Sequence, residues 1–312
     1  MSPPLFTVLL PVHRPPTLLP LAVRSVLAQS LGAFELFIIC DGAPAETVAV
    51  AEAFARSDPR VRVFAHPKGE RNGEAWRHLA LQGAVGRYVC QIADDDLWFD
   101  NHLAEAEQLM SAADFGSLIT VQLRPDGRPF VDMADLAHPG VRGLMLGAAY
   151  NLFGPTASAY SLAAYRALPV GWSPAPQGIW SDLYMWRKFL AQPGLRFASR
   201  PVATGFGFPA VLRGEMSLEQ RLAESAPYAA RLGDVGFREA LWRAALLELG
   251  TRDLRLRNQS GAHQRRGEAA EARVAELHAA LAAIAAAAGD SAAQSRLAQA
   301  ALTAQQAAAG EG

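Results

Sequence analysis

A short apolar run that is followed at once by three carboxylates constrains this chain more than any other stretch of its sequence. Residues 88–93 read YVCQIA, and their β-branched and aromatic members are typical of a buried strand. Asp94, Asp95 and Asp96 come next, and Asp100 can cap a following helix. Adjacent acids at the end of a buried strand repel one another, and a hard divalent cation suits their oxygens. The alternative is a solvated acidic turn in which Asp96 is a second helix cap.

The N-terminal half of the chain alternates strand-like and helix-like segments. The strand-like apolar runs are 5–10, 34–40, 61–64 and 88–93. Alternation of this kind predicts an α/β fold with a mostly parallel central sheet flanked by helices, and ligands bind where such strands end. Polar residues follow the strand ends at His13, Asp41 and the acidic triplet. This convergence favours a binding site over a solvated turn.

Composition limits the classes of protein to which the chain can belong. Hydrophobic residues make up 51% and charged residues 19%, which supports a sizeable core. The formal net charge of −1 argues against a nucleic-acid binder that relies on overall basicity. Cys40 and Cys90 lie in apolar runs and are interpreted as reduced core residues. With no recognisable signal peptide and no uninterrupted apolar run of about 20 residues, we expect a cytoplasmic protein.

A set of segments, in order, resembles inverting glycosyltransferases of family 2, which have the GT-A fold. These segments are VLLP at 8–11, SVLAQS at 25–30, FELFIICDG at 34–42, GEAWRH at 73–78, GRY at 86–88, ADDD at 93–96 and WSDLYMWR at 180–187. The resemblance covers about residues 5–215. It implies a GT-A domain over residues 1–215, whose nucleotide-binding half is Rossmann-like.

The resemblance implies roles for residues on the donor side. Asp41 matches the aspartate that hydrogen-bonds the nucleotide base, and the loop at Pro11 and His13 borders that base from the other side. Arg77 matches a basic position of the donor region, where a guanidinium can meet base or phosphate. Asp94 is expected near the ribose.

The resemblance also implies a metal site and a catalytic base. Asp95 matches the carboxylate that ligates the metal on the diphosphate, and Asp96 supports it, so the expected cofactor is Mn2+ or Mg2+. Asp182 matches the general base, and Trp180 lies beside it near the acceptor. A metal stabilises the leaving diphosphate, while the base takes the proton of the attacking hydroxyl. A metal and a base placed in this way imply a single in-line displacement with inversion. The alternative interpretation of Asp182 is a helix cap.

The chain departs from the family pattern at several positions. Cys40 and Ala93 replace acids, and His78 replaces an asparagine. Ser181 stands in place of the glutamate before the base, and residues 204–209 contain no counterpart of a histidine that in many relatives reaches the metal.

The leading hypothesis is a hexosyltransferase that uses a nucleotide-diphospho sugar, with a UDP-sugar expected first. Its acceptor would be a glycan, a lipid-linked molecule or a protein, as in polysaccharide biosynthesis. The alternative is a glycosyltransferase-like binding or scaffold protein without turnover, because an acid and a histidine of the metal shell are missing. A nucleotidyltransferase is a weaker third hypothesis, since residues 11–16 are no glycine-rich phosphate loop.

Composition changes after residue 215, and we expect a helical, alanine-rich extension over residues 216–312. A basic stretch at 252–257 can contact anionic lipid at the inner face of a membrane, or it can be a solvated helix face. Heptad spacing over about two repeats indicates a short coiled coil for homo-oligomerisation or docking, and a frayed tail is the alternative. The heptad positions are Val274, Leu277, Leu281, Ile284 and Ala288.

Overall fold

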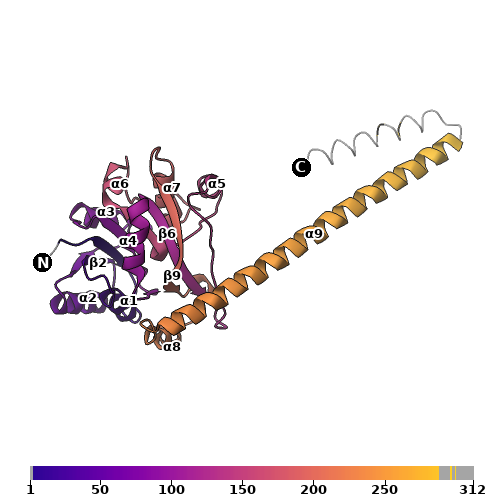
Figure 1. Cartoon of the computed structure of the whole chain (residues 1–312). Helices are drawn as coiled ribbons and strands as arrows, with labels where there is room; N and C mark the ends of the chain where they lie inside the picture. The colour runs from indigo at the N-terminus through magenta and orange to yellow at the C-terminus, as the bar shows by residue number, and fades with distance from the viewer. Residues whose placement is uncertain (1–2, 288–295, 297–298, 300–312) are drawn as a thin grey trace. The chain divides into compact units, whose positions relative to one another are not determined.

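The computed structural model describes residues 3–287 together with Arg296 and Gln299. The chain divides into two compact units, Met1–Leu249 and Gly250–Gly312. The domain boundary at residue 215 that we expected from composition stays a prediction. It contains one mixed sheet with helices on both faces, labelled in Figure 1.

Parallel strands build the N-terminal half of the sheet. β1 (Phe6–Val12) lies between β2 (Phe34–Asp41) and β4 (Tyr88–Gln91). β3 (Val61–His66) pairs with the other side of β2. Every residue of β2 and of β4 is buried. The near-continuous apolar runs in the sequence follow from this burial on both faces, and the predicted α/β class is confirmed.

Antiparallel pairs enter the sheet beyond β4. β8 (Ser158–Ser161) runs antiparallel to both β4 and β6 (Phe115–Leu123), and β9 (Phe197–Gly207) is parallel to β6. The remaining strands are β5 (Leu97–Trp98), which pairs with β9, and β7 (Pro129–Phe130), which pairs with β6. The parallel half is therefore as expected, and the sheet as a whole is mixed.

Helices cover the two faces of the sheet because side chains alternate along each strand. Leu10 packs with one layer of helices and its neighbour Leu9 with the other. The helices of the first layer are α1 (Leu19–Leu27), α2 (Ala45–Ser57) and α4 (His102–Ala112). Those of the second are α3 (Glu74–Gln82), α5 (Pro139–Gly147), α6 (Leu162–Ala167) and α7 (Ser181–Leu190). The short 3-10 helices are η1 (Pro155–Ala157) and η2 (Ala210–Leu212).

A third apolar cluster joins residues after 215 to the sheet. It combines Phe206 of β9 with Tyr228 of α8 (Leu218–Ala229), whose rings are 5.0 Å apart, and with Leu241 at the start of α9 (Val235–Ala287). Leu241 is buried. This contact explains why the first compact unit continues to Leu249.

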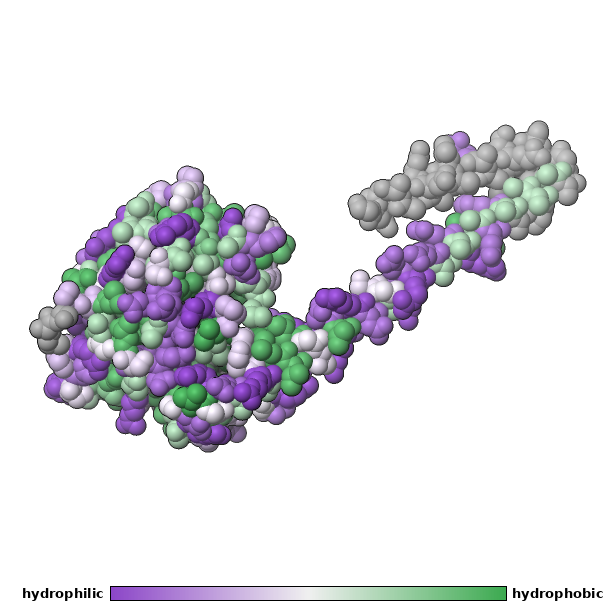
Figure 2. Space-filling view, in the orientation of Figure 1, coloured by the Kyte–Doolittle hydropathy of each residue, from purple (hydrophilic) through white to green (hydrophobic). Residues whose placement is uncertain are grey.

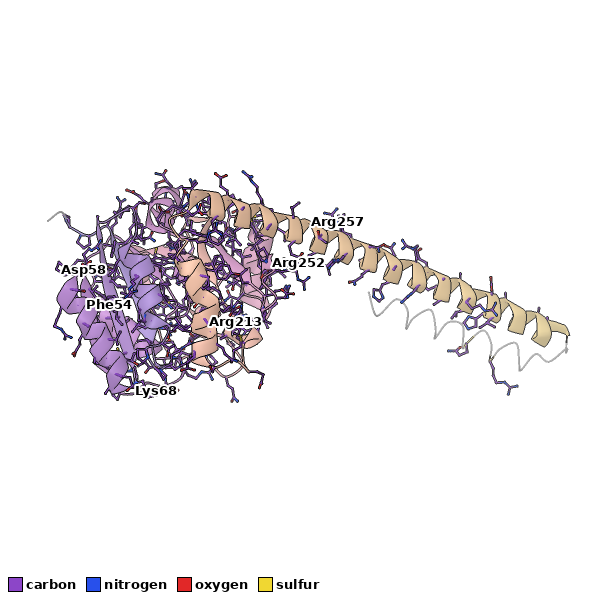
Figure 3. The ribbon with its side chains drawn as sticks, turned by 90° about the horizontal axis from the view of Figure 1, so that it is seen from below. Phe54, Asp58, Lys68, Arg213, Arg252 and Arg257 are labelled. Atoms are coloured by element: carbon purple, nitrogen blue, oxygen red, sulfur yellow. The ribbon has the colours of Figure 1, made fainter. Side chains whose placement is uncertain are left out.

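The second unit is described only through its helix, residues 250–287. Arg252 and Arg257 lie on this helix (Figure 3), and the described part carries mainly hydrophilic surface with scattered apolar residues (Figure 2). Val274 and Leu277 are exposed. The side chains of Leu281 and Ile284 are not described and Ala288 lies outside the described residues, so the coiled coil stays a prediction. No helix in the described ranges is long and apolar enough to cross a membrane.

Trp98 and His102 form a buried stack behind the acidic triplet. Their rings are 3.8 Å apart and nearly parallel, at 9°. His102 Nδ1 lies 3.0 Å from Thr204 Oγ1, and Trp98 Nε1 donates to the carbonyl oxygen of Thr156 at 3.0 Å. Burial lowers the pKa of His102 to about 3, because a charged imidazole loses its hydration there. The His102 ring is therefore neutral in the folded protein at neutral pH.

This burial predicts an acid-sensitive fold. The unfolded chain protonates His102 at about pH 6.5, so the stabilising contribution is complete above that pH and is lost as pH falls toward the folded pKa. We expect the free energy of unfolding to fall less between about pH 7 and pH 4 in His102→Gln than in the wild type. Urea unfolding at the two pH values measures this, with the exposed His263→Gln as control. Equal falls in wild type and His102→Gln would contradict the prediction.

Candidate active site

The parallel order of β2, β1 and β4 brings three predicted polar clusters to one edge of the sheet. His13 follows β1, Asp41 ends β2, and the acidic triplet follows β4. The pKa of His13 shows their proximity. It is lowered mainly by burial and also by Arg14 and Lys68, whereas Asp41 and Asp95 act to raise it. Pro11 lies inside β1 and pairs with Ile39, so the loop that carries His13 begins later than the sequence predicted.

A loop after β3 encloses the Asp41 carboxylate. Lys68 Nζ donates to Asp41 Oδ2 at 2.5 Å, and the backbone N–H of Gly69 donates to Oδ1 at 2.6 Å. Gly73 has a φ of +68°, and a Cβ there would come within 2.6 Å of Asp41 Oδ2. The loop can therefore approach Asp41 only because residue 73 is glycine. We did not predict Lys68 as a site residue from the sequence, although a lysine beside a glycine at a strand end is a recognisable signal for anion contact.

Two arginines from distant segments neutralise the first acids of the triplet. Arg14 lies in the loop after β1, with Nε 3.0 Å from Asp94 Oδ2 and Nη1 3.2 Å from Asp95 Oδ2. Arg221 of α8 places Nη2 2.5 Å from the same oxygen of Asp95, although the two residues are 126 positions apart. Sequence reasoning missed Arg221, because an arginine in an amphipathic helix carries no signal for its partner.

Asp96 is held by different partners. Thr156 Oγ1 donates to Asp96 Oδ2 at 2.5 Å, and the backbone N–H of Phe208 lies 3.4 Å from Oδ1. Burial and the nearby charge of Asp95 raise the pKa of both Asp94 and Asp96 above the usual carboxylate range. The triplet is thus a buried, charge-compensated cluster and not a solvated turn.

The triplet in this arrangement does not fit a divalent cation. Asp95 Oδ2, the oxygen that the resemblance assigns to the metal, already accepts from Arg14 and Arg221. Among the residues that the structure describes, no group of three or more His, Cys, Asp and Glu side chains is placed to hold a metal ion. The expected Mn2+ or Mg2+ at Asp95 and Asp96 stays a prediction, and no chemical step below depends on it.

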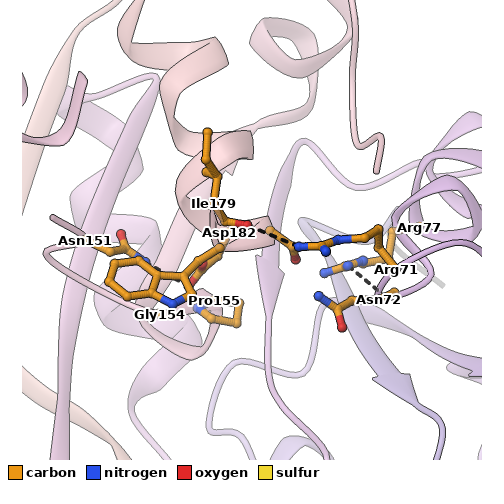
Figure 4. Close-up of a pocket in the computed structure, with 10 residues that line it drawn as sticks. Arg71, Asn72, Arg77, Asn151, Gly154, Pro155, Ile179 and Asp182 are labelled. Carbon is orange, nitrogen blue, oxygen red and sulfur yellow. Dashed lines mark hydrogen bonds between the residues drawn. The ribbon is translucent and has the colours of Figure 1, made fainter. Parts of the chain in front are cut away.

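Asp182 lies in a separate cavity of about 600 Å³, together with Arg77 and Trp180 (Figure 4). α7 begins one residue earlier, at Ser181, with Trp180 as its N-cap residue, so Asp182 is in the first turn and is not the cap. Asn151 Nδ2 donates to Asp182 Oδ2 at 2.8 Å, and the backbone N–H of Leu183 donates to Oδ1 at 2.8 Å. Burial raises the pKa of Asp182, which these hydrogen bonds partly oppose. A raised pKa brings a carboxylate closer to the range that suits a general base.

Arg77 and Arg71 both line the cavity that contains Asp182. Arg77 is the one whose charge acts on the pKa of Asp182. It extends from α3, is buried, and its guanidinium lies 4.1 Å from the centre of the Trp172 ring. Its Nη2 donates to the carbonyl oxygen of Asn72 at 3.0 Å. Burial lowers the pKa of Arg77, and the charges of Asp182 and Asp41 act to raise it, so Arg77 is within electrostatic reach of both acids. A guanidinium remains protonated in this setting.

The structure therefore arranges the predicted residues in two neighbouring groups. Arg77, Asp182 and Trp180 line the cavity, where Trp180 is 57% exposed. Asp41, His13 and the acidic triplet lie at the sheet edge and do not line that cavity. Arg77 connects the two groups electrostatically.

Comparison with known proteins identifies the class of domain that carries this site. Residues 7–151 match the sequence profile described as Glycosyl transferase family 2. This segment is a glycosyltransferase family 2 domain. The match includes the Asp41 loop, Arg77 and the acidic triplet, and it ends at Asn151, before Asp182.

A solved structure supports the GT-A fold of this glycosyltransferase domain. S. aureus TarS 1–349 in complex with UDP-GlcNAc is similar with a TM-score of 0.53 and 17% identity, over 65% of this chain and 58% of that one. At this identity the likeness concerns the fold alone.

Curated relatives of the domain are similar over short stretches. An uncharacterized glycosyltransferase of Rickettsia conorii is 31% identical over 30% of this chain and 15% of its own length. The uncharacterized glycosyltransferase EpsJ of Bacillus subtilis is 28% identical over 34% of this chain and 31% of its own length. The chain thus spans less than a third of the length of these two relatives.

The pairing of Arg221 with Asp95 predicts a measurable coupling. Both side chains are mostly buried, and removal of one partner of a buried pair leaves the other charge uncompensated. Because Arg14 still contacts Asp95, we expect Arg221→Met to lower the free energy of unfolding by about 3 kcal/mol. Asp95→Asn in the same chain should restore part of that loss.

Urea unfolding of the wild type, both single variants and the double variant gives the coupling energy directly. Arg128→Met, which breaks an exposed ion pair with Asp126, is the control and should unfold like the wild type. A coupling energy near zero between Arg221 and Asp95 would show that the contact does not stabilise the domain.

Proposed function

We propose that the protein is an inverting glycosyltransferase that moves a sugar from a nucleotide-diphospho sugar to an acceptor hydroxyl. The observation that carries the proposal is the placement of Asp182, a half-buried carboxylate with a raised pKa, in the cavity that Arg77 also lines. The family 2 domain supplies the class of reaction. A base on one side and a cation on the other are what an in-line displacement at the anomeric carbon requires.

Asp182 is the proposed general base. Its Oδ2 is oriented by Asn151 and its Oδ1 by the backbone of Leu183, so the carboxylate has a fixed direction before substrate arrives. As the acceptor oxygen attacks, its proton passes to Asp182. Trp180, at the mouth of the cavity, is the proposed apolar contact for the acceptor.

Cationic side chains are proposed to stabilise the leaving nucleoside diphosphate. Arg77 faces the cavity, and Arg14 and Arg221 surround the acidic triplet at the adjacent edge. Guanidinium groups match phosphate geometry through paired hydrogen bonds. Asp41, held by Lys68, is proposed at the base-binding position, beside His13.

The donor is proposed to be a UDP-sugar in the first instance, with a glycan, lipid-linked or protein acceptor, as in polysaccharide biosynthesis. A cytoplasmic location, at the inner face of a membrane when the basic stretch near Arg252 contacts lipid, belongs to the same proposal. Self-association through residues 250–287 is the proposed role of the C-terminal helix.

A binding protein without turnover is the second candidate function. The arrangement of Arg14 and Arg221 on Asp95 favours it, because these ion pairs occupy the carboxylate that the resemblance assigns to a catalytic metal. Ala93 stands where the family carries a further acid. Both candidates require a nucleotide to bind at the Asp41 edge, and only the first requires Asp182 as a base.

Nucleotide binding is the first test. Titration calorimetry with UDP, GDP and dTDP is expected to detect binding of at least one of them at micromolar to millimolar Kd. Parallel titrations with Mn2+ and with EDTA decide whether the cation contributes. Affinity that appears only with Mn2+ means that Arg14 and Arg221 release Asp95 to the metal. No binding of any of the nucleotides in either condition would contradict both candidate functions.

Asp182→Asn tests turnover. The amide keeps the size of the side chain and its place in the helix, but it cannot take a proton. We expect the transfer rate to fall by about 10²–10⁴-fold, while nucleotide affinity is unchanged. Asp126→Asn, in an exposed turn, is the matched control and should retain the wild-type rate. Near-normal turnover by a folded Asp182→Asn protein would assign the base to another residue.

A further inference from the structure

A second cavity, of about 280 Å³, adjoins the one that contains Asp182. The two share Asn151 and Gly154 as lining residues. Alternate residues of β6, among them Thr120 and Gln122, form one wall of the second cavity, and Phe130 of β7 contributes to it. The side chains on one face of a strand are thus presented directly beside the proposed base.

Two buried polar atoms of this cavity have no hydrogen-bond partner within the described part of the chain. They are Thr120 Oγ1 and Asn151 Oδ1. Buried polar atoms are nearly always paired, and an unpaired one costs stability unless a ligand or water completes it. Both atoms can accept a hydrogen bond, and Thr120 can also donate one. A ligand that carries hydroxyl groups would pair with both.

Asn151 connects the second cavity to Asp182. Its Nδ2 donates to Asp182 Oδ2 at 2.8 Å, as Figure 4 shows. An ionised carboxylate only accepts hydrogen bonds, so the amide nitrogen must face Asp182 and the amide oxygen is left for a ligand. A hydroxyl that donates to Asn151 Oδ1 would therefore lie next to the proposed base.

The lining chemistry indicates the class of ligand. Hydroxyl and amide groups at Thr120, Gln122 and Asn151 and the carboxylate of Asp132 line the cavity, together with apolar surface from Phe130 and Phe153. This combination suits a sugar ring, which has hydroxyls at its rim and C–H groups on its faces. The described residues that line the cavity include no Arg, Lys or His, so the site lacks the cations that a phosphate group requires.

We propose that this cavity is the acceptor subsite, that it binds an uncharged sugar residue of a glycan, and that Asn151 positions the acceptor hydroxyl against Asp182. The proposal rests on the proposed function and names its acceptor. In the reaction the bond between the anomeric carbon and the phosphate oxygen breaks, and its electron pair leaves with the nucleoside diphosphate. A bond forms between the acceptor oxygen and that carbon, and the hydroxyl proton moves to the Asp182 carboxylate.

Thr120→Val tests the subsite with little change of shape, because it replaces a hydroxyl with a methyl group. The probe is a panel of methyl glycosides, used as acceptors with the UDP-sugar that the protein accepts, and release of UDP is measured. We expect at least one glycoside to accelerate release in the wild type. Thr120→Val should raise the KM for that glycoside roughly tenfold, as for one lost hydrogen bond. Thr120→Ser, which keeps the hydroxyl, should restore a KM near that of the wild type.

Asn151→Ala is the second variant. It should lower kcat for transfer as well as raise the glycoside KM, because the amide contacts both the acceptor and Asp182. UDP affinity, measured by calorimetry, should match that of the wild type in both variants, which excludes a general loss of folding.

The outcomes separate this proposal from the proposed function. Acceleration by an alkyl phosphate, but by no glycoside of the panel, would overturn the sugar subsite. An unchanged glycoside KM in Thr120→Val would overturn it also. In both cases, slow hydrolysis of the UDP-sugar that is lost in Asp182→Asn would leave the proposed function standing. Absence of that hydrolysis together with absence of nucleotide binding would overturn the proposed function and the subsite with it.

Discussion

The parallel pairing of β1 with β2 and with β4 is the constraint on which the rest of the molecule depends. Parallel strands need both faces covered, so helices occupy both sides and polar side chains are left to the strand ends. Because the carboxyl ends of neighbouring parallel strands meet at one edge, His13, Asp41 and the acidic triplet converge there. The antiparallel β8 continues the sheet beyond β4, and Thr156, just before β8, donates a hydrogen bond to Asp96.

Charge compensation explains why the domain includes residues after 215. Three adjacent buried acids are unfavourable without positive charge near them. Arg14 pairs with Asp94 and Asp95 from the loop after β1, and Arg221 pairs with Asp95 from α8. The apolar contact of Tyr228 with Phe206 holds α8 against the sheet, so packing and electrostatics fix the same helix. A C-terminal helix thereby becomes part of the sheet edge that carries the acidic triplet.

The polar groups of the two cavities differ in a way that suits two different substrates. The proposed donor side, around Arg77 and the arginines at the triplet, is strongly charged, which suits recognition of a diphosphate. The second cavity is lined by hydroxyl, amide and aromatic groups together with Asp132. Asn151 lies between the cavities and contacts Asp182 with one end of its amide. In the proposed reaction a single side chain therefore orients the base and the attacking hydroxyl together.

The strand runs, the α/β class and the acidic triplet can be predicted from the sequence, because each depends on residues that are adjacent or regularly spaced. The ordered segments around Asp41, Arg77 and Asp94 also indicated family 2 from the sequence. Tertiary structure decided what no local pattern encodes. The partner of Asp95 is Arg221, 126 positions away, and Asn151 meets Asp182 across 31 positions. Arg14 and Arg221 pair with Asp94 and Asp95, which no local pattern indicates, since charge balance depends on which side chains the fold brings within a few ångströms.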